Sequence, residues 1–258
     1  MSDVSEVVQS FIDRQPGLNR RRRLMMPFIQ FILNLFCRTQ VNGLQNIPSS
    51  GRTILIANHL SFFDPGIATA VVKHRYVISM AKHESINNLL VRLVIALWGN
   101  YYVKRGTVDR QALLNTIELI KHEQLVWLAP EGTRHREGLQ EPKDGIAYIA
   151  AKANATIVPM SIIGISDLGH NVARLRRTPV EVNFGAPFRF NADENTRLTR
   201  PMRSQMTQEA MYQIACTIPE NHAHLRGAYA NLESATTDTL IFLDLPVPDG
   251  ETHARSVY

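Results

Sequence analysis

The chain of 258 residues is long enough for one large α/β domain, or for a domain of about 200 residues with short additions at its ends. Lys and Arg outnumber Asp and Glu by 28 to 23, and the resulting charge of +5 favours a partner with negative charge. The two cysteines, Cys37 and Cys216, lie in unrelated segments without ligand spacing, which argues against a disulfide framework and a zinc site.

An apolar stretch, LMMPFIQFILNLFC, occupies residues 24–37 and follows four consecutive arginines at 20–23. As a helix it would be roughly 21 Å long, shorter than the bilayer core of about 30 Å. Its polar residues, Gln30 and Asn34 with Arg38 beyond, recur every fourth position and leave most of the circumference apolar. The pattern predicts a helix lying in a membrane interface, with its arginines at anionic headgroups. A buried core helix with a solvated basic flank is the alternative.

Beyond a turn-rich link, short β-branched runs alternate with longer helical patterns. This order is typical of an α/β fold, a mostly parallel sheet flanked by helices. We expect strands at 53–57, 75–81, 100–104, 124–129, 156–163 and 180–185. We expect helices at 65–73, 84–98, 107–122, 143–153 and 201–217.

Three regions follow from this pass along the chain. We expect residues 1–40 to form a basic, amphipathic membrane-interface segment and residues 41–218 to form the α/β domain. Residues 219–258 are a C-terminal tail in which no chemical pattern is recognisable.

The segment ILIANHLSFFDPG, residues 54–66, leaves an apolar strand and places Asn58, His59 and Asp64 directly after it. Positions five apart are about 140° out of line on a helix, so the chain has to turn for His59 and Asp64 to meet. Asp64-Pro65 suits the start of a helix, with Asp as N-cap and Pro in the first helical position. We expect the carboxylate to accept one imidazole N–H and to leave the other nitrogen free as a base. An N-cap aspartate beside an unrelated histidine is the alternative.

Two further motifs end at the same presumptive sheet edge. The first is GNYYVKRG with Arg105, and the second is LAPEGTR, whose residues 130–134 combine a glycine that permits close backbone approach with an arginine suited to phosphate or carboxylate. Taken singly, a Glu-Gly turn or a surface arginine has little specificity.

Together, NHLSFFD, GNYYVKR, PEGTR and IVPM resemble the glycerolipid acyltransferase superfamily, which includes the 1-acyl-sn-glycerol-3-phosphate acyltransferases. The resemblance covers about residues 40–190. It implies that His59 and Asp64, an H-x4-D pair, are catalytic. It implies that the following residues bind the phosphorylated acceptor: Arg105, Glu131, Gly132, Thr133 and Arg134, with Lys82 as a less direct match.

The chain departs from the family pattern at two places. Ala129 stands where an aromatic residue is usual, and Lys143 and Gly145 match a Lys-x-Gly stretch only loosely. Both departures bear on acyl-chain or acceptor preference more than on the reaction.

The resemblance implies an O-acyltransferase of phospholipid biosynthesis that moves a fatty acyl group from acyl-CoA or acyl-carrier protein to a lysophospholipid, foremost lysophosphatidic acid. Its partners would be membrane lipids, the lysophospholipid acceptor and the thioester donor, without a metal, a tightly bound cofactor or nucleic acid. We expect it at the cytoplasmic face of a membrane, peripheral or monotopic. Another lyso-lipid acceptor and a catalytically silent lipid-binding protein remain alternatives. The arginines of RLRRTP, residues 174–179, are either a solvated flank or a contact to a membrane or to a coenzyme A phosphate.

Overall fold

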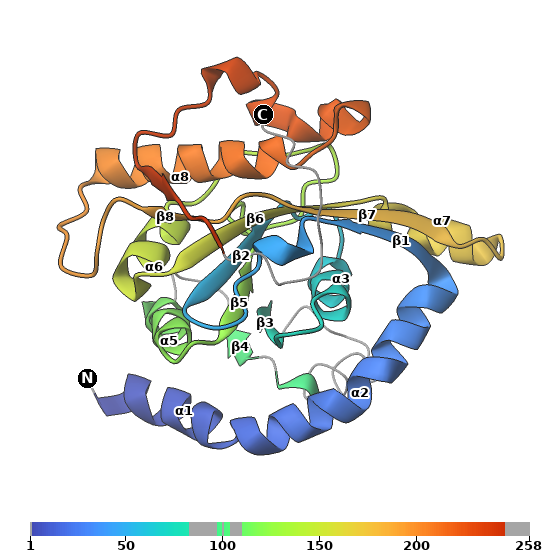
Figure 1. Ribbon diagram of the computed structural model, residues 1–258, viewed down its shortest axis with the longest axis horizontal. Coiled ribbons are helices and arrows are strands. Elements are labelled where there is room, and N and C mark those ends of the chain that lie inside the picture. Colours follow the sequence, from blue (N-terminus) through green and yellow to red (C-terminus); the bar gives the residue numbers. More distant parts are fainter. Residues whose placement is uncertain (1, 83–96, 100, 104–109, 246–258) are drawn as a thin grey trace.

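The computed structural model describes residues 2–82, 97–99, 101–103 and 110–245 (Figure 1). The helices are α1 (Ser2–Asp13), α2 (Gln15–Phe36), α3 (Asp64–Val71), α5 (Arg110–Lys121), α6 (Gly145–Ala153), α7 (Leu168–Ala173) and α8 (Arg200–Cys216). The strands are β1 (Cys37–Asn42), β2 (Thr53–Ala57), β3 (Val77–Lys82), β4 (Tyr101–Val103), β5 (Leu125–Leu128), β6 (Thr156–Ile163), β7 (Thr178–Phe184), β8 (Phe188–Phe190) and β9 (Leu240–Phe242). Short 3-10 helices are η1 (Leu44–Asn46), η3 (Ile165–Asp167), η4 (Glu220–Tyr229) and η5 (Leu232–Ser234).

One sheet organises the molecule, with its strands in the order β1-β7-β6-β2-β5-β3-β4. The run β6-β2-β5-β3-β4 is parallel throughout, and β1 is parallel to β7. Strand β7 is antiparallel to β6, and β8 and β9 add a second antiparallel section beside β6. The expectation of a mostly parallel α/β sheet flanked by helices is therefore confirmed.

The central strands are buried on both faces, which explains why their sequences are mainly apolar rather than alternating. In β2 the side chains of Ile54 and Ile56 enter one hydrophobic cluster, and Leu55 and Ala57 enter the other. The first cluster contains residues of α1, α5, α6 and α8, and the second contains residues of α3. This two-sided burial fixes β2 in place and so fixes the position of the loop that follows it.

The N-terminal helices α1 and α2 run along the outside of the molecule in an arc (Figure 1). Val8, Phe11 and Leu18 of these helices belong to the first core cluster. The beginning of the predicted membrane segment is therefore packed against the α/β domain. Helix α2 also begins earlier than the apolar stretch at 24–37, because Gln15 and Leu18 give its first turns a buried face of their own.

Arg22 corrects the expectation that all four arginines face lipid headgroups. Its side chain is 0 % exposed. Nε donates to the Trp98 carbonyl at 2.8 Å, and Nη1 donates to the side-chain oxygens of Gln15 and Asn19. Burial lowers the pKa of Arg22 to about 10, so the group is still charged at neutral pH. Arg22 thus anchors α2 to the body of the protein.

The second half of α2 has the opposite character. Leu24, Phe28, Phe31 and Leu35 are exposed, and at 3.6 residues per turn they fall within roughly 60° of the helix circumference. Among the described residues, no helix combines the length and apolar character needed to cross a membrane.

The C-terminal tail is part of the same structure. Its strand β9 pairs with β8, and Leu225 and Tyr229 of η4 enter the first core cluster. Residues 219–243 therefore extend the sheet and cover α8.

Candidate active site

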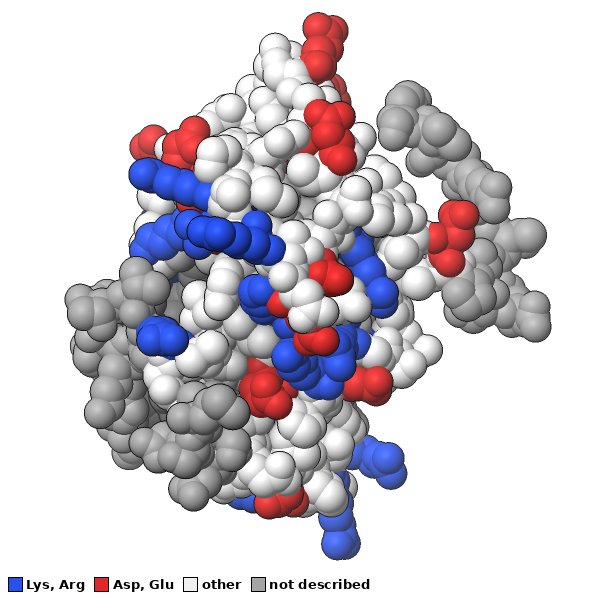
Figure 2. Space-filling model, turned by 90° about the vertical axis from the view of Figure 1, so that its left-hand side faces the viewer, with Lys and Arg blue, Asp and Glu red and all other residues white. Residues whose placement is uncertain are grey.

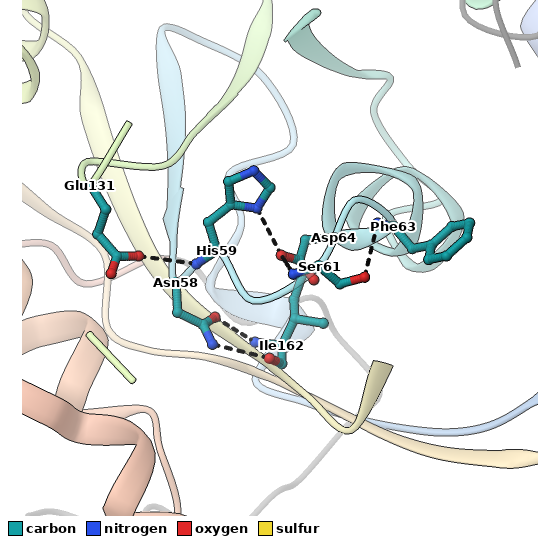
Figure 3. Close-up of polar contacts among 7 residues, drawn as sticks. All are labelled: Asn58, His59, Ser61, Phe63, Asp64, Glu131 and Ile162. Carbon is teal, nitrogen blue, oxygen red and sulfur yellow. Dashed lines mark hydrogen bonds and ion pairs between the residues drawn. The ribbon is translucent and has the colours of Figure 1, made fainter. Parts of the chain in front are cut away.

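His59 and Asp64 face each other across a short turn between β2 and α3 (Figure 3). Nδ1 of His59 lies 2.8 Å from Oδ2 of Asp64. Among the described residues Nε2 has no hydrogen-bond partner, and the side chain is 19 % exposed. With its proton on Nδ1, the ring donates to the carboxylate and presents an unprotonated Nε2 as a base.

Asp64 is completely buried, at 0 % exposure. The same Oδ2 accepts the backbone N–H of Ser61 at 2.8 Å. Burial raises the pKa of Asp64, and the hydrogen bonds from His59 and Ser61 oppose that rise. Asp64 is the first residue of α3 rather than its N-cap, which is Phe63. Its side chain turns back towards the preceding loop and is therefore not available to cap the helix.

Asn58 holds the loop against the neighbouring strand. Its side-chain amide donates to the carbonyl of Ile162 and accepts that residue's N–H, at 3.1 and 2.9 Å. This pair of bonds continues the β2–β6 ladder by one step after β2 ends. The ring of His59 also meets Trp127 of β5 edge to face, with centroids 5.4 Å apart. Both contacts limit how far the histidine can move.

Glu131 is placed to support the loop rather than to meet a ligand. Its side chain is buried, and its oxygens accept the backbone N–H groups of His59 and Gln140. Burial raises its pKa, opposed by these two backbone hydrogen bonds. A buried carboxylate would also repel a phosphate. Both oxygens of Glu131 thus hold backbone N–H groups, one of them that of the candidate base, and its part in binding the acceptor stays a prediction.

The rest of the Pro-Glu-Gly-Thr-Arg segment turns outwards beside His59. Gly132 has a φ of +70°, a conformation that favours glycine. Thr133 and Arg134 are exposed, and the His135 N–H donates to the His59 carbonyl at 2.8 Å. Because Arg134 directly precedes His135, this bond keeps Arg134 close in space to the histidine loop.

Lys143 is a cation that sequence reasoning noted only as a loose match. Its side-chain carbons lie 3.2 Å from the position that a Cβ on Gly132 would occupy. Its backbone N–H donates to the Pro130 carbonyl, which joins the two loops. The Lys-x-Gly spacing of Lys143 and Gly145 was the sequence pattern that pointed to this lysine.

The two remaining predicted residues are less well placed. Lys82 is the last residue of β3, at the same sheet edge as His59 by the register of β3 with β5 and of β5 with β2. Arg105 lies outside the described residues. No group of three or more potential metal ligands occurs among the residues that the structure describes.

Comparison with known proteins agrees with this geometry. Residues 38–163 match the sequence profile of the Acyltransferase family. The matched stretch is just under half of the chain and contains both His59 and Asp64. A 1-acyl-sn-glycerol-3-phosphate acyltransferase of Borreliella burgdorferi is 29% identical over 125 residues, covering 47% of this chain and 50% of that protein. The enzyme of the same name from Streptococcus pneumoniae is 30% identical over 135 residues, covering 52% and 49%.

A solved structure supports the fold over most of the chain. The crystal structure of the 1-acyl-sn-glycerophosphate (LPA) acyltransferase PlsC from Thermotoga maritima matches with a TM-score of 0.55 at 22% sequence identity, and covers 84% of this chain and 83% of that one. The human 1-acyl-sn-glycerol-3-phosphate acyltransferase alpha is 29% identical over 149 residues, covering 56% of this chain and 52% of that protein. The chain spans about half the length of the curated relatives it matches.

Proposed function

We propose that this protein transfers a fatty acyl group from an acyl thioester, acyl-CoA or acyl-carrier protein, to the free hydroxyl of lysophosphatidic acid, giving phosphatidic acid. The observation that carries the proposal is the His59–Asp64 pair, in which a buried carboxylate 2.8 Å from Nδ1 leaves Nε2 free. The names of the relatives supply the choice of acceptor.

The chemistry needs one base and no enzyme-bound acyl group. Nε2 of His59 takes the proton of the acceptor hydroxyl as its oxygen attacks the thioester carbonyl carbon. The carbon–sulfur bond then breaks, and the imidazolium returns the proton to the departing thiolate. Asp64 holds the ring in the required tautomer and stabilises the imidazolium, as the acid member of a catalytic triad does.

We propose that the cations beside the turn at Gly132 bind the acceptor. Arg134 is exposed two residues after the turn at Gly132, and the Lys143 side chain lies against that turn. A guanidinium makes charge-assisted, often bidentate hydrogen bonds to phosphate. We assign the acceptor phosphate to Arg134, with Thr133, Gly132 and Lys143 beside it. Arg105 and Lys82 keep the binding roles that the family resemblance implies.

Helix α2 is proposed to bring the protein to its lipid substrate. Its exposed apolar side chains, Leu24, Phe28, Phe31 and Leu35, would lie among acyl chains of the cytoplasmic leaflet. Arg20 and Arg21, one turn earlier on the same side, would meet anionic headgroups. Arg22, which anchors the helix from within, is excluded from this contact.

The test is an acyl-transfer assay on purified protein with a panel of acceptors. Labelled acyl-CoA, or in parallel the labelled acyl thioester of acyl-carrier protein, is supplied with lysophosphatidic acid, lysophosphatidylcholine, a lyso-aminolipid or monoacylglycerol in detergent micelles. Preference for lysophosphatidic acid supports the proposal. Turnover only with another lyso-lipid would show that lysophosphatidic acid is not the acceptor, and would leave acyl transfer as the reaction. Absence of turnover with every acceptor and with both kinds of donor would favour a catalytically silent lipid-binding protein.

A further inference from the structure

The turn that joins α7 to β7 presents an unusual combination of side chains. Leu175 at its tip is 98 % exposed, and Val172 of α7 is also exposed. Arg174 and Arg176 flank Leu175 and are exposed, and no ion pair of either arginine occurs among the described residues. An apolar tip between two free cations is the pattern of a surface that meets a charged, apolar partner.

Leucine is uncommon at a position with the backbone conformation of residue 175. Leu175 has a φ of +54°, and its N–H donates to the Val172 carbonyl, while the Arg176 N–H donates to the Asn171 carbonyl. These are the two hydrogen bonds of a Schellman motif, in which the residue at the position of Leu175 is usually glycine. Neither packing nor backbone preference favours leucine here, so its presence requires another explanation.

The turn lies next to the end of α2. Arg177 donates two hydrogen bonds, from Nε and Nη2, to the carbonyl of Cys37, the residue that directly follows α2. The strand register pairs Cys37 with Thr178 and Arg38 with Pro179. In Figure 1, α7 projects beside the end of α2 and the beginning of β1. The exposed apolar face of α2 and the tip at Leu175 therefore belong to neighbouring parts of the surface.

The same edge of the sheet carries the active site. Strand β6 leads into η3 and α7 at its carboxyl end, and Asn58 is hydrogen-bonded to Ile162 near that end. Phe62 and Phe63, which follow His59, are exposed on this edge as well. Apolar side chains of α2, the α7–β7 turn and the His59 loop are thus grouped at one end of the parallel strands.

We propose that the α7–β7 turn, residues 172–177, is a second membrane contact that inserts Leu175 into an anionic bilayer while Arg174 and Arg176 bind lipid phosphates. The inference rests on the proposed membrane association through α2. Two separated contacts, one at α2 and one at α7, fix the orientation of a protein on a surface, whereas one helix leaves it free to roll about its axis. In this orientation the His59 edge of the sheet faces the bilayer that holds the acceptor.

A membrane explains the turn better than a soluble phosphorylated ligand does. Arginines alone are enough to bind a coenzyme A phosphate. Such a ligand would make no use of an exposed leucine at a position that favours glycine. The acids nearest in sequence, Asp167 and Glu181, leave a net positive charge over residues 167–181, which complements anionic headgroups.

The direct experiment places an environment-sensitive fluorophore on the tip. Leu175→Cys in a Cys216→Ser background is labelled with a nitrobenzoxadiazole dye; the remaining cysteine, Cys37, is buried. Vesicles of phosphatidylcholine with phosphatidylglycerol should shift its emission to the blue and raise its intensity. The same dye at Ile241→Cys, on β9 at the opposite side of the molecule, should report water throughout. A dye at residue 175 that still reports water when the protein is vesicle-bound would overturn the proposal.

Substitutions give an independent readout. Leu175→Gly should weaken vesicle binding about tenfold, because the apolar side chain that enters the bilayer is removed. The Tm should stay equal or rise, because glycine favours this backbone conformation. Arg174→Gln/Arg176→Gln should weaken binding to anionic vesicles by about fivefold per arginine and reduce its salt dependence. The matched control is Arg197→Gln/Arg200→Gln. These arginines lie before and at the start of α8, on the side of the molecule where acidic and basic side chains are intermixed (Figure 2).

The outcomes separate this inference from the proposed function. If Arg174→Gln/Arg176→Gln raises the KM for acyl-CoA and leaves vesicle affinity at the wild-type value, the two arginines belong to the donor site. That result would overturn the membrane assignment. Turnover of lysophosphatidic acid by the wild-type protein in detergent micelles is measured separately. Its absence would count against the proposed reaction whatever the fluorophore reports.

Discussion

Replacing Phe28 and Phe31 by serine tests whether the exposed face of α2 meets a membrane. The two side chains are 66% and 61% exposed, so of about 200 Å² for each phenylalanine roughly 130 and 120 Å² face outwards. At about 25 cal/mol per Å², complete insertion would contribute about 3 kcal/mol for each ring. If half of that area enters the acyl region, the double substitution costs about 3 kcal/mol, which is roughly 100-fold in partitioning.

The assay is flotation of the full-length protein with phosphatidylcholine/phosphatidylglycerol vesicles, together with the Tm of each variant. Because both rings point outwards, stability should change by no more than about 0.5 kcal/mol. Met202→Ser/Ile241→Ser, which removes exposed apolar side chains from α8 and β9, is the matched control and should bind like the wild type.

Two results would refute this reasoning. Unchanged flotation of Phe28→Ser/Phe31→Ser would show that α2 is not the membrane contact. A large fall in Tm would show that the rings are packed against the protein in solution. Point substitutions are preferable to removing residues 1–38, since that deletion takes Val8, Phe11 and Leu18 out of the core.

Three further predictions concern anchoring, pH and the acceptor. Arg22→Met should lower stability by about 2 kcal/mol, or about 4–8 °C in Tm, because Trp98, Gln15 and Asn19 lose their donor; the exposed neighbour Arg23→Met should change little, and equal Tm values for the two would contradict the anchoring role. The pKa of Glu131 is raised in the folded state, so its contribution to stability is greatest below the unfolded pKa and is lost as the pH rises through the folded one. The Tm of Glu131→Gln minus that of the wild type should therefore be more positive at about pH 7.5 than at about pH 4.5, and a difference independent of pH would argue against a raised pKa. Arg134→Ala should lower kcat/KM for lysophosphatidic acid by about 10- to 100-fold, with Arg134→Lys between it and the wild type, and an equal loss with an acceptor that lacks phosphate would remove the phosphate from the role of Arg134.

The central strands could be predicted from the sequence because a strand that is buried on both faces consists mainly of apolar residues. The bounds of β2 and β6 coincide with the predicted runs at 53–57 and 156–163, both mainly apolar and bordered by turns or polar residues. Strand β1 was missed, since CRTQVN at the sheet edge is exposed at most positions and has no apolar run. Strand β9 is three residues long and is defined only by its partner β8.

In the site, too, contacts between residues near in sequence could be predicted, and contacts between residues far apart in sequence could not. The approach of His59 to Asp64 follows from a five-residue spacing and a turn at Asp64-Pro65, both of which are visible in the sequence. The position of Glu131 depends on backbone N–H groups of His59 and Gln140, which only the folded chain brings together. Arg22 looks like its three neighbours in the sequence. Its burial depends on Trp98, which lies 76 residues away in the sequence.

We assign His59 as the base of the acyl transfer and Asp64 as the residue that orients it. The decisive measurement is kcat for labelled acyl transfer to lysophosphatidic acid by His59→Ala, with Asp64→Asn beside it and the Tm of both recorded. General-base contributions are typically at least 10²-fold, so kcat of folded His59→Ala should fall by about that factor or more. Asp64→Asn should also be severely impaired, because an amide neither fixes the tautomer nor balances the imidazolium. A folded His59→Ala protein that retains most of the wild-type turnover would show that His59 is not the base.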